Sequence, residues 1–185
     1  MKLNESINTD EVAKLVKDNN IIGIFQGRSE SGPRALGNRS FILNPCIESN
    51  KDKMNLFKGR ELFRPLAASV LEQHAEEWFH MLNIKKSPYM TFSFKVRENK
   101  KNLIPAVVHC DNSCRIQTVN KKENLYFYEL INHFYKLTSI PMVLNTSFNL
   151  AGDPLVETVE DALNTFDKSN LNYLYFPELK ILLSK

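Results

Sequence analysis

Apolar residues recur along the chain in short runs that alternate with amphipathic or polar segments. The runs predict strands at 21–25, 40–43, 67–71, 89–96, 106–109, 115–119, 141–144, 173–176 and 180–183. Apolar residues at helical spacing predict helices from Asn8 to about Lys17, over 51–57, 73–80 and 125–137, and from about Thr158. Strands interleaved with helices at these intervals predict an α/β or α+β fold with a mixed sheet.

The chain has the size and composition of one compact domain. It contains 185 residues, of which 43% are hydrophobic and 24% charged, which suffices for a sizeable core. No internal repeat, low-complexity segment or Gly/Ser/Pro-rich linker divides it, so we predict a single domain over residues 1–185.

Charge is distributed unevenly along the sequence. The formal net charge is only +3, but basic residues crowd between Arg28 and Arg64, whereas acidic ones collect at 72–77 and 153–161. This asymmetry favours a local anion site over an extended surface for a polyanion. We therefore expect no nucleic-acid partner.

Cysteine usage and hydropathy indicate the compartment. The three cysteines, Cys46, Cys110 and Cys114, form no CxxC pair, and no signal peptide or apolar run of membrane-spanning length is present. We predict reduced thiols, a cytoplasmic protein and no membrane contact. His109, Cys110 and Cys114 could ligate a metal, but without a second ligand pair at zinc spacing we expect no metal site in the protein.

Three arginines lie on a glycine-rich turn directly after the predicted strand 21–25. The stretch GRSESGPRALGNRSF carries Arg28, Arg34 and Arg39 among Gly27, Gly32 and Gly37. Glycines allow a backbone to approach a ligand, and guanidinium groups match phosphate or carboxylate bidentately. The alternative is a surface loop with solvated arginines, because the stretch matches neither a P-loop nor GxGxxG.

A second basic segment is KGRELFRP, from Lys58 to Pro65. In a strand, Lys58, Arg60 and Arg64 would share one face, and in a helix Arg60 and Arg64 would do so. Either geometry gathers positive charge. The alternative is a salt-bridged surface that uses Glu61.

Polar residues follow two of the predicted strands. In VLNTSFN, residues Asn145, Ser147 and Asn149 alternate and would share one side of a continued strand, or else form a local turn. In HCDNSCRIQTV, a polar cluster could form from His109, Asp111 and Arg115, although a lone histidine on a strand is more often structural. Ser147 and His109 leave a weak hydrolase alternative, without the order of a catalytic triad.

Taken together, these segments resemble one family. GRSESGPRALGNRSF, KGRELFRPLAASVLE, SPYM, PAVVHCDNSCRIQTV and VLNTSFNLAGDPLVETVEDAL are similar, in this order, to the C-terminal domain of the O-carbamoyltransferases that modify antibiotics and nodulation factors. The resemblance implies a YrdC-like fold, an open twisted mixed sheet flanked by helices, with a basic concave face. It runs from about Ile21 to about Tyr175.

The resemblance also implies an activity. The domain would bind ATP with Mg²⁺ and carbamoyl phosphate, and would form carbamoyl adenylate. The family's residues fall on Lys58, Arg64, Arg34, Arg115, Asn145 and Ser147. We expect Lys58, Arg64, Asn145 and Ser147 to be catalytic. Around the nucleotide and phosphate we expect Arg28, Arg34, Arg39, Arg60, His109, Arg115 and Asn149.

The sequence departs from the family at several points. The family's usual Gly-Thr-Ala is replaced by Asn112, Ser113 and Cys114, and its usual Phe and Pro are replaced by Leu66 and Ala68. We expect these changes to alter the shape of the binding pocket more than its charge. The family's N-terminal Kae1-like domain, which binds the acceptor, has no counterpart here. We therefore expect a Kae1-like partner chain or an excised domain. The alternatives are an RNA- or nucleotide-binding module without transferase activity, and a degenerate regulatory or scaffold protein.

Overall fold

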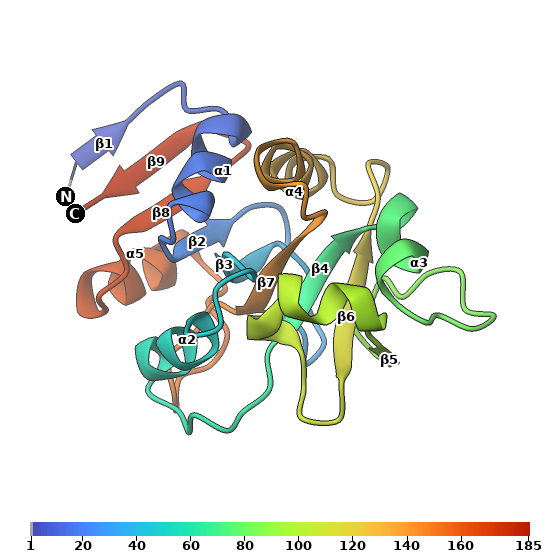
Figure 1. Cartoon of the computed structure of the whole chain (residues 1–185). Coiled ribbons are helices and arrows are strands. Elements are labelled where there is room, and N and C mark those ends of the chain that lie inside the picture. The colour runs from blue at the N-terminus through green and yellow to red at the C-terminus, as the bar shows by residue number, and fades with distance from the viewer. Residues whose placement is uncertain (1) are drawn as a thin grey trace.

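The computed structural model describes residues 2–185, and within them one sheet of nine strands runs through the whole molecule (Figure 1). The strands are β1 Lys2–Asn4, β2 Ile22–Phe25, β3 Arg39–Leu43, β4 Ala67–Leu71, β5 Ser93–Lys95, β6 Ser113–Val119, β7 Met142–Ser147, β8 Tyr173–Phe176 and β9 Ile181–Ser184. The α-helices are α1 Thr9–Lys17, α2 Asn50–Lys58, α3 Ala75–Trp78, α4 Leu125–Thr138 and α5 Val159–Lys168. Short 3-10 helices occupy η1 Glu72–His74, η2 Glu98–Leu103 and η3 Pro105–Val107.

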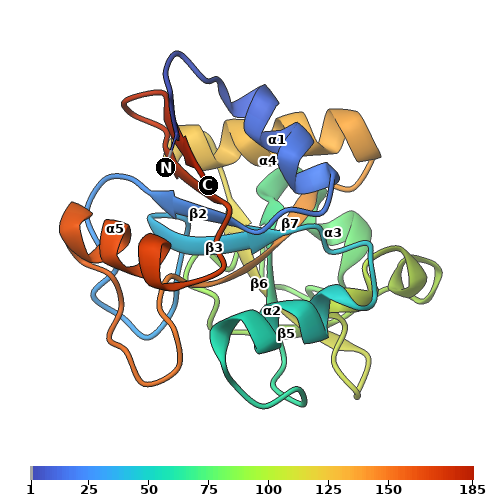
Figure 2. The same ribbon diagram turned by 90° about the vertical axis from the view of Figure 1, so that its left-hand side faces the viewer.

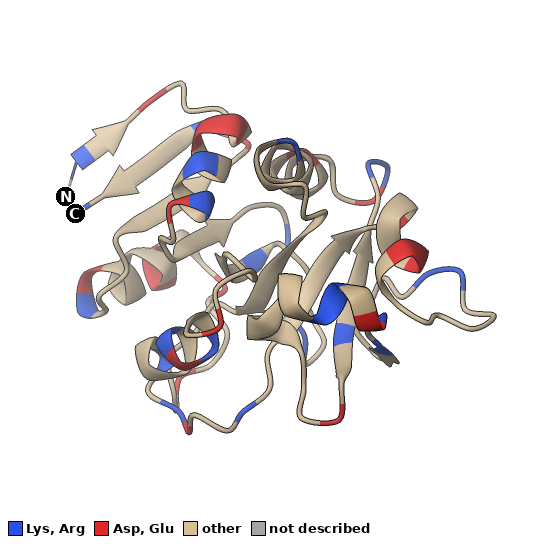
Figure 3. Cartoon of the chain, in the orientation of Figure 1, with Lys and Arg blue, Asp and Glu red and all other residues tan. Residues whose placement is uncertain are grey.

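The sheet is mixed and open. Its order is β1-β9-β8-β2-β3-β7-β4-β6-β5, with β2 parallel to β8, β4 parallel to β6, and antiparallel pairs elsewhere. Helices α1 and α4 lie above strands β2 and β3 in Figure 2, and α2 lies below them. Apolar residues from the sheet and the helices form one continuous core. Charged side chains lie mostly on helices and loops, while the central strands carry few (Figure 3).

Local sequence explains where the helices begin and end. Asn8 and Thr158 cap α1 and α5 in reciprocal capping boxes with Glu11 and Asp161. Helix α2 ends at Lys58 because Gly59 adopts the left-handed conformation, at φ 69°. The chain therefore turns sharply after Lys58, and the side chain at the end of α2 is fixed next to the sheet.

Most predicted elements are confirmed, within a residue or two at their ends. The predicted strand 106–109 is wrong, because Pro105 starts the 3-10 turn η3 and the buried Ala106 and Val107 pack from that turn. The predicted helix 73–80 is divided between η1 and the single turn of α3. The strand predicted at 89–96 is a regular strand only over β5, and Val96 adds an isolated bridge to Phe79. Strand β1 was not predicted, since only its pairing with β9 makes it a strand.

Candidate functional site

Lys58 is buried at the end of α2, with 4% of its surface exposed. Its ammonium Nζ donates to the carbonyl oxygen of Ser147 at 2.5 Å, to Ser147 Oγ at 3.0 Å and to Asn149 Oδ1 at 3.0 Å. These three oxygens are neutral, and no carboxylate lies within salt-bridge distance among the described residues. When Lys58 is protonated, no carboxylate of the described residues pairs with its charge.

Burial decides the protonation of Lys58. Desolvation lowers the pKa of Lys58 from 10.5 to about 7, and the charge of Arg60 lowers it further in the same direction. Near neutral pH the amine therefore exists in both charged and neutral forms. A bound anion would favour the charged form.

A cavity of about 450 Å³ opens beside Lys58. It is lined by Lys58, Gly59, Arg60, Glu61, Arg64, Ser147, Asn149, Leu150, Ala151 and Gly152. Arg60 donates from Nε to Asn55 Oδ1 at 2.7 Å, but its buried Nη2 has no partner among residues 2–185. Arg64 is exposed and pairs with Glu61 at 2.7 Å. Glu61 is the only carboxylate in the lining, and Arg64 already engages it.

Arg115 and Arg34 extend this group of cations. Burial lowers the pKa of Arg115, and the charge of Arg34 lowers it further. Burial also lowers the pKa of Arg60, and the charges of Arg64 and Arg115 act in the same direction. Arg115 Nε is buried without a hydrogen-bond partner. Arginines remain charged at working pH despite such shifts, so the cluster repels itself until an anion binds.

Asn145 lies on β7, within a buried polar network that the sequence did not reveal in full. Its Nδ2 donates to the carbonyl of Ala35 at 3.1 Å and to Ser69 Oγ at 2.8 Å. Ser69 in turn donates to Gln117 Oε1 at 2.7 Å, and Gln117 Nε2 donates to the carbonyl of Leu36 at 2.8 Å. The signal for Ser69 and Gln117 was present as polar residues inside apolar strands, but only the fold brings them together.

Glu30 organises the glycine-rich loop between β2 and β3. Its Oε1 accepts from the backbone N–H groups of Leu36 at 2.7 Å and Asn38 at 2.9 Å. Gly37 has φ 103° and packs against Phe127 of α4, where a Cβ atom would lie 2.3 Å from the ring. The loop is therefore tied down from within and rests on the sheet through Ala35 and Leu36. Glu30 is the single carboxylate of this stretch. That isolated acidic residue is the sequence signal that could have indicated its role in fixing the loop.

Two of the loop's arginines, Arg28 and Arg39, lie in different environments. Arg39 is buried and donates to the carbonyl oxygens of Gln26 at 2.6 Å and Glu157 at 3.0 Å, while its guanidinium lies 3.6 Å from the ring centroid of Phe25. These contacts tie the β2–β3 loop to the segment before α5, and the role expected for Arg39 in anion binding stays a prediction. Arg28 is exposed, and only its carbonyl oxygen is engaged, by Asn38.

Arg34 is the loop's arginine that approaches the cluster. It is exposed and lines a separate cavity of about 600 Å³ together with Tyr89 and Thr91. Its charge lowers the pKa of Arg115, so Arg34 lies within electrostatic range of Arg115 while it lines this second cavity.

His109 lies in a neighbouring cavity of about 380 Å³, which Phe63 and Leu66 also line. Its Nε2 is 2.9 Å from the carbonyl of Leu66, and its Nδ1 is 3.3 Å from Ser113 Oγ. Ser113 donates to Asp111 Oδ1 at 2.7 Å. Nε2 donates to the carbonyl of Leu66, which fixes the ring, and His109 does not line the cavity that contains Ser147.

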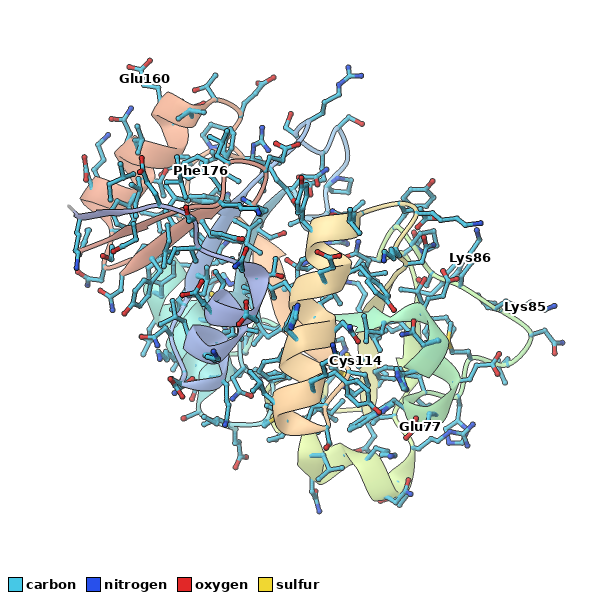
Figure 4. The ribbon with its side chains drawn as sticks, turned by 90° about the horizontal axis from the view of Figure 1, so that it is seen from above. Glu77, Lys85, Lys86, Cys114, Glu160 and Phe176 are labelled. Carbon is cyan, nitrogen blue, oxygen red and sulfur yellow. The ribbon has the colours of Figure 1, made fainter. Side chains whose placement is uncertain are left out.

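The cysteines do not gather around a common point. Cys114 lies in the interior, as Figure 4 shows, and burial raises its pKa to about 12, whereas Cys110 is exposed. Over residues 2–185, no group of three or more His, Cys, Asp or Glu side chains could hold a metal ion. None of the helices in this range is long and apolar enough to cross a bilayer.

The structure therefore brings together the ends of three segments that are distant in sequence. Lys58 and Arg60 come from the end of α2, Ser147 and Asn149 from the end of β7, and Arg115 from β6. Buried donors without partners and a cation cluster with a single carboxylate, Glu61, are suited to binding a polyanion.

Sequence comparison assigns the family. The chain matches the carbamoyltransferase C-terminus family over residues 13–182, and therefore belongs to it. The nodulation protein NolNO of Sinorhizobium fredii is 46% identical over 88% of this chain, and NolO of Bradyrhizobium diazoefficiens is 46% identical over 83%. The alignments cover only 24% and 28% of those relatives, so the chain spans about a quarter of their length.

Structural comparison confirms the YrdC-like fold. HypF in its phosphate- and nucleotide-bound form matches 98% of this chain with a TM-score of 0.60 at 14% identity, over 22% of its own length. Sua5 of P. abyssi, complexed with L-threonine, matches 91% with a TM-score of 0.61 at 13% identity, over 46% of its length. At these identities the likeness concerns the fold alone.

Proposed function

We propose that this domain forms carbamoyl adenylate from ATP and carbamoyl phosphate. The observation that carries the proposal is the buried Lys58 ammonium, which contacts only neutral oxygens and shares its cavity with Arg60, whose Nη2 is a buried donor without a partner among the described residues. A site of this kind gains most from a ligand with several negative charges. Family membership supports the carbamoyl group as the transferred unit.

The proposed chemistry takes two balanced steps. Water cleaves carbamoyl phosphate to carbamate and inorganic phosphate, with release of protons. A carbamate oxygen then attacks the α-phosphorus of ATP, the bond to the bridging oxygen breaks, and pyrophosphate leaves with that electron pair. The product is the mixed anhydride carbamoyl adenylate.

The residues of the cavity support these steps electrostatically. An anionic oxygen must approach an anionic phosphate, and preorganised cations offset that repulsion and stabilise the leaving pyrophosphate. We assign this role to Lys58, Arg60 and Arg64, with Arg115 and Arg34 at the adjoining side. Ser147 and Asn149 position the Lys58 ammonium through the contacts described above.

The donor set also indicates how magnesium would enter. Mg²⁺ prefers oxygen ligands, and the only carboxylate in the cavity lining, Glu61, is paired with Arg64. These residues fit the phosphate oxygens of a nucleotide better than a bare cation. Mg²⁺ would therefore arrive with ATP and offset phosphate charge, while the protein contributes Lys58 and the arginines.

The whole reaction needs an acceptor half. Because the chain spans about a quarter of its curated relatives, we propose that a Kae1-like chain receives the carbamoyl group and passes it to a hydroxyl. Carbamoyl adenylate would hydrolyse in water, so that chain should dock over the open side of the cavity.

Incubation of the folded chain with ATP, Mg²⁺ and carbamoyl phosphate tests the proposal. We expect pyrophosphate release that depends on carbamoyl phosphate, and carbamoyl adenylate detectable by mass spectrometry. Lys58→Met should abolish both, whereas Lys85→Met, which changes an exposed lysine at the periphery (Figure 4), should leave them unchanged. Absence of adenylate from protein shown to bind ATP would contradict the proposed reaction.

A further inference from the structure

One buried amide holds the basic segment that follows α2. Asn55 lies in α2, and none of its surface is exposed. Its Oδ1 accepts from Arg60 Nε at 2.7 Å, and its Nδ2 donates to the carbonyl oxygens of Leu62 at 3.1 Å and Arg64 at 3.0 Å. A single side chain therefore contacts three positions of the segment 60–64.

The orientation of this amide is fixed by its partners. Backbone carbonyls can only accept and a guanidinium nitrogen can only donate, so the oxygen and the nitrogen of Asn55 cannot be exchanged. Both protons of Nδ2 have an acceptor. The backbone carbonyl of Asn55 also accepts from the N–H of Arg60 at 3.0 Å. Side chain and backbone of Asn55 thus fix the chain directly after the helix.

The segment has few other constraints on its conformation. Residues 61–65 are exposed and belong to no helix or strand. Among residues 2–185, the remaining hydrogen bonds of 61–64 run within the segment, from the backbone N–H and from Nε of Arg64 to Glu61. Without Asn55, this segment would be free to leave the end of α2.

Arg60 is held by one nitrogen and left free at the others. The guanidinium is planar, so a hydrogen bond at Nε orients the whole group. Its Nη2 is buried without a partner, and Arg60 lines the cavity beside Lys58. The amide is neutral, whereas a carboxylate at position 55 would cancel the charge that an anion needs. Asn55 therefore orients Arg60 without neutralising it.

We propose that Asn55 is a positioning residue for polyphosphate binding, which holds Arg60 and the backbone at Arg64 in place before the ligand arrives. The inference rests on the proposed function, in which these arginines contact ATP. Ordering a long side chain or a loop during binding opposes affinity. A segment that Asn55 has already ordered avoids this cost.

Two matched variants in the same helix test the assignment. Asn55→Ala should weaken ATP binding by about tenfold in titration calorimetry without carbamoyl phosphate. Asn50→Ala removes an equally buried amide of α2, which donates to the carbonyl of Asn44 at 2.7 Å and does not line the cavity. It should destabilise the fold but keep ATP affinity within about twofold. Equal losses of affinity in the two variants would overturn the assignment, because affinity would then follow the stability of α2.

A double variant shows whether Asn55 acts through Arg60. In the Arg60→Ala background, Asn55→Ala should weaken ATP binding at least about threefold less than it does in the unchanged chain. A merely structural role of Asn55 would give the same loss in both backgrounds. That additive result would overturn the proposed link.

A measurement on the unchanged chain decides if Asn55→Ala does not fold. In nuclear magnetic resonance spectra, the Nε–H of Arg60 should exchange with water more slowly than that of the exposed Arg28, whose side chain makes no hydrogen bond to any described residue. Equal exchange would overturn the assignment. None of these measurements needs turnover, so absence of carbamoyl adenylate would contradict the proposed reaction while leaving the role of Asn55 intact.

Discussion

Lys58 combines three features that rarely occur together in a lysine. It is buried, it donates to three neutral oxygens at the end of β7, and burial lowers its pKa to about 7. A charge without an opposite partner costs folding free energy, and a bound polyanion would offset that cost. Anion binding by this residue should therefore depend on pH.

ATP binding should weaken as the pH rises above 7. In the free chain Lys58 loses its proton around pH 7, whereas bound phosphate raises its pKa, so binding takes up about half a proton at pH 7. Affinity should fall by up to about tenfold per pH unit above 7, until the pH reaches the pKa of the bound state. Calorimetry in buffers of different ionisation enthalpy measures the proton uptake.

Lys58→Met should bind more weakly, and should lose this pH dependence once the titration of the nucleotide itself is subtracted. Lys85→Met should retain it. An unchanged pH profile in Lys58→Met would show that another group takes up the proton.

Arg64 should contact phosphate through its planar fork. Arg64→Ala should lower ATP affinity or the rate of pyrophosphate release by about one to two decades without unfolding the chain. Arg64→Lys should not restore activity, because a single ammonium group cannot replace two parallel hydrogen bonds. Steady-state kinetics on variants with unchanged circular dichroism provide the test, and full activity of Arg64→Ala would remove this residue from the site.

At the scale of elements, the glycine-rich loop between β2 and β3 is held in one conformation by specific contacts. Glu30 binds its backbone N–H groups, Gln117 and Asn145 bind its carbonyl oxygens, and Gly37 packs on α4. The loop therefore depends on contacts from the sheet and from a helix. This is why its arginines have different roles although they look alike in the sequence.

Gly37→Ala should destabilise the protein, whereas Gly32→Ala should not. A Cβ atom at Gly37 would meet the ring of Phe127 at 2.3 Å, on a backbone with φ 103°, while one at Gly32 meets nothing within 4 Å. We expect a loss of at least about 2 kcal/mol at Gly37 and a change within about 0.5 kcal/mol at Gly32. Urea unfolding measures both, and equal stability of the two variants would contradict the packing described here.

At the scale of the whole molecule, the proposed adenylate site and the two ends of the chain lie at different places on the sheet. Strand β1 pairs with β9, with Lys2 opposite Ser184. These two strands form one edge of the open sheet, and other strands separate them from β4 and β6 (Figure 1). The termini and the site are therefore spatially separate. A partner could cover the cavity without disturbing the edge where the chain begins and ends.

The chain alone should not transfer a carbamoyl group to an alcohol. We expect adenylate to form and hydrolyse, with no carbamoylated product, until a Kae1-like chain is added to receive the intermediate. Mass spectrometry of a panel of alcohols, with and without such a chain, makes the comparison. Transfer to an alcohol by the purified chain alone would contradict the need for a second half.

The sequence by itself determined most elements and the segments that form the site. Apolar runs identified β2, β4 and β7, and capping residues such as Asn8 and Thr158 marked helix starts, because both signals depend on neighbours within a few residues. The tertiary structure alone decided which side chains meet. Lys58 and Ser147 are in contact although they are 89 positions apart. Strand register and loop packing likewise bury the Arg39 side chain and leave Asn145 Oδ1 without a hydrogen-bond partner among the described residues. These depend on contacts between distant segments, which no local pattern encodes.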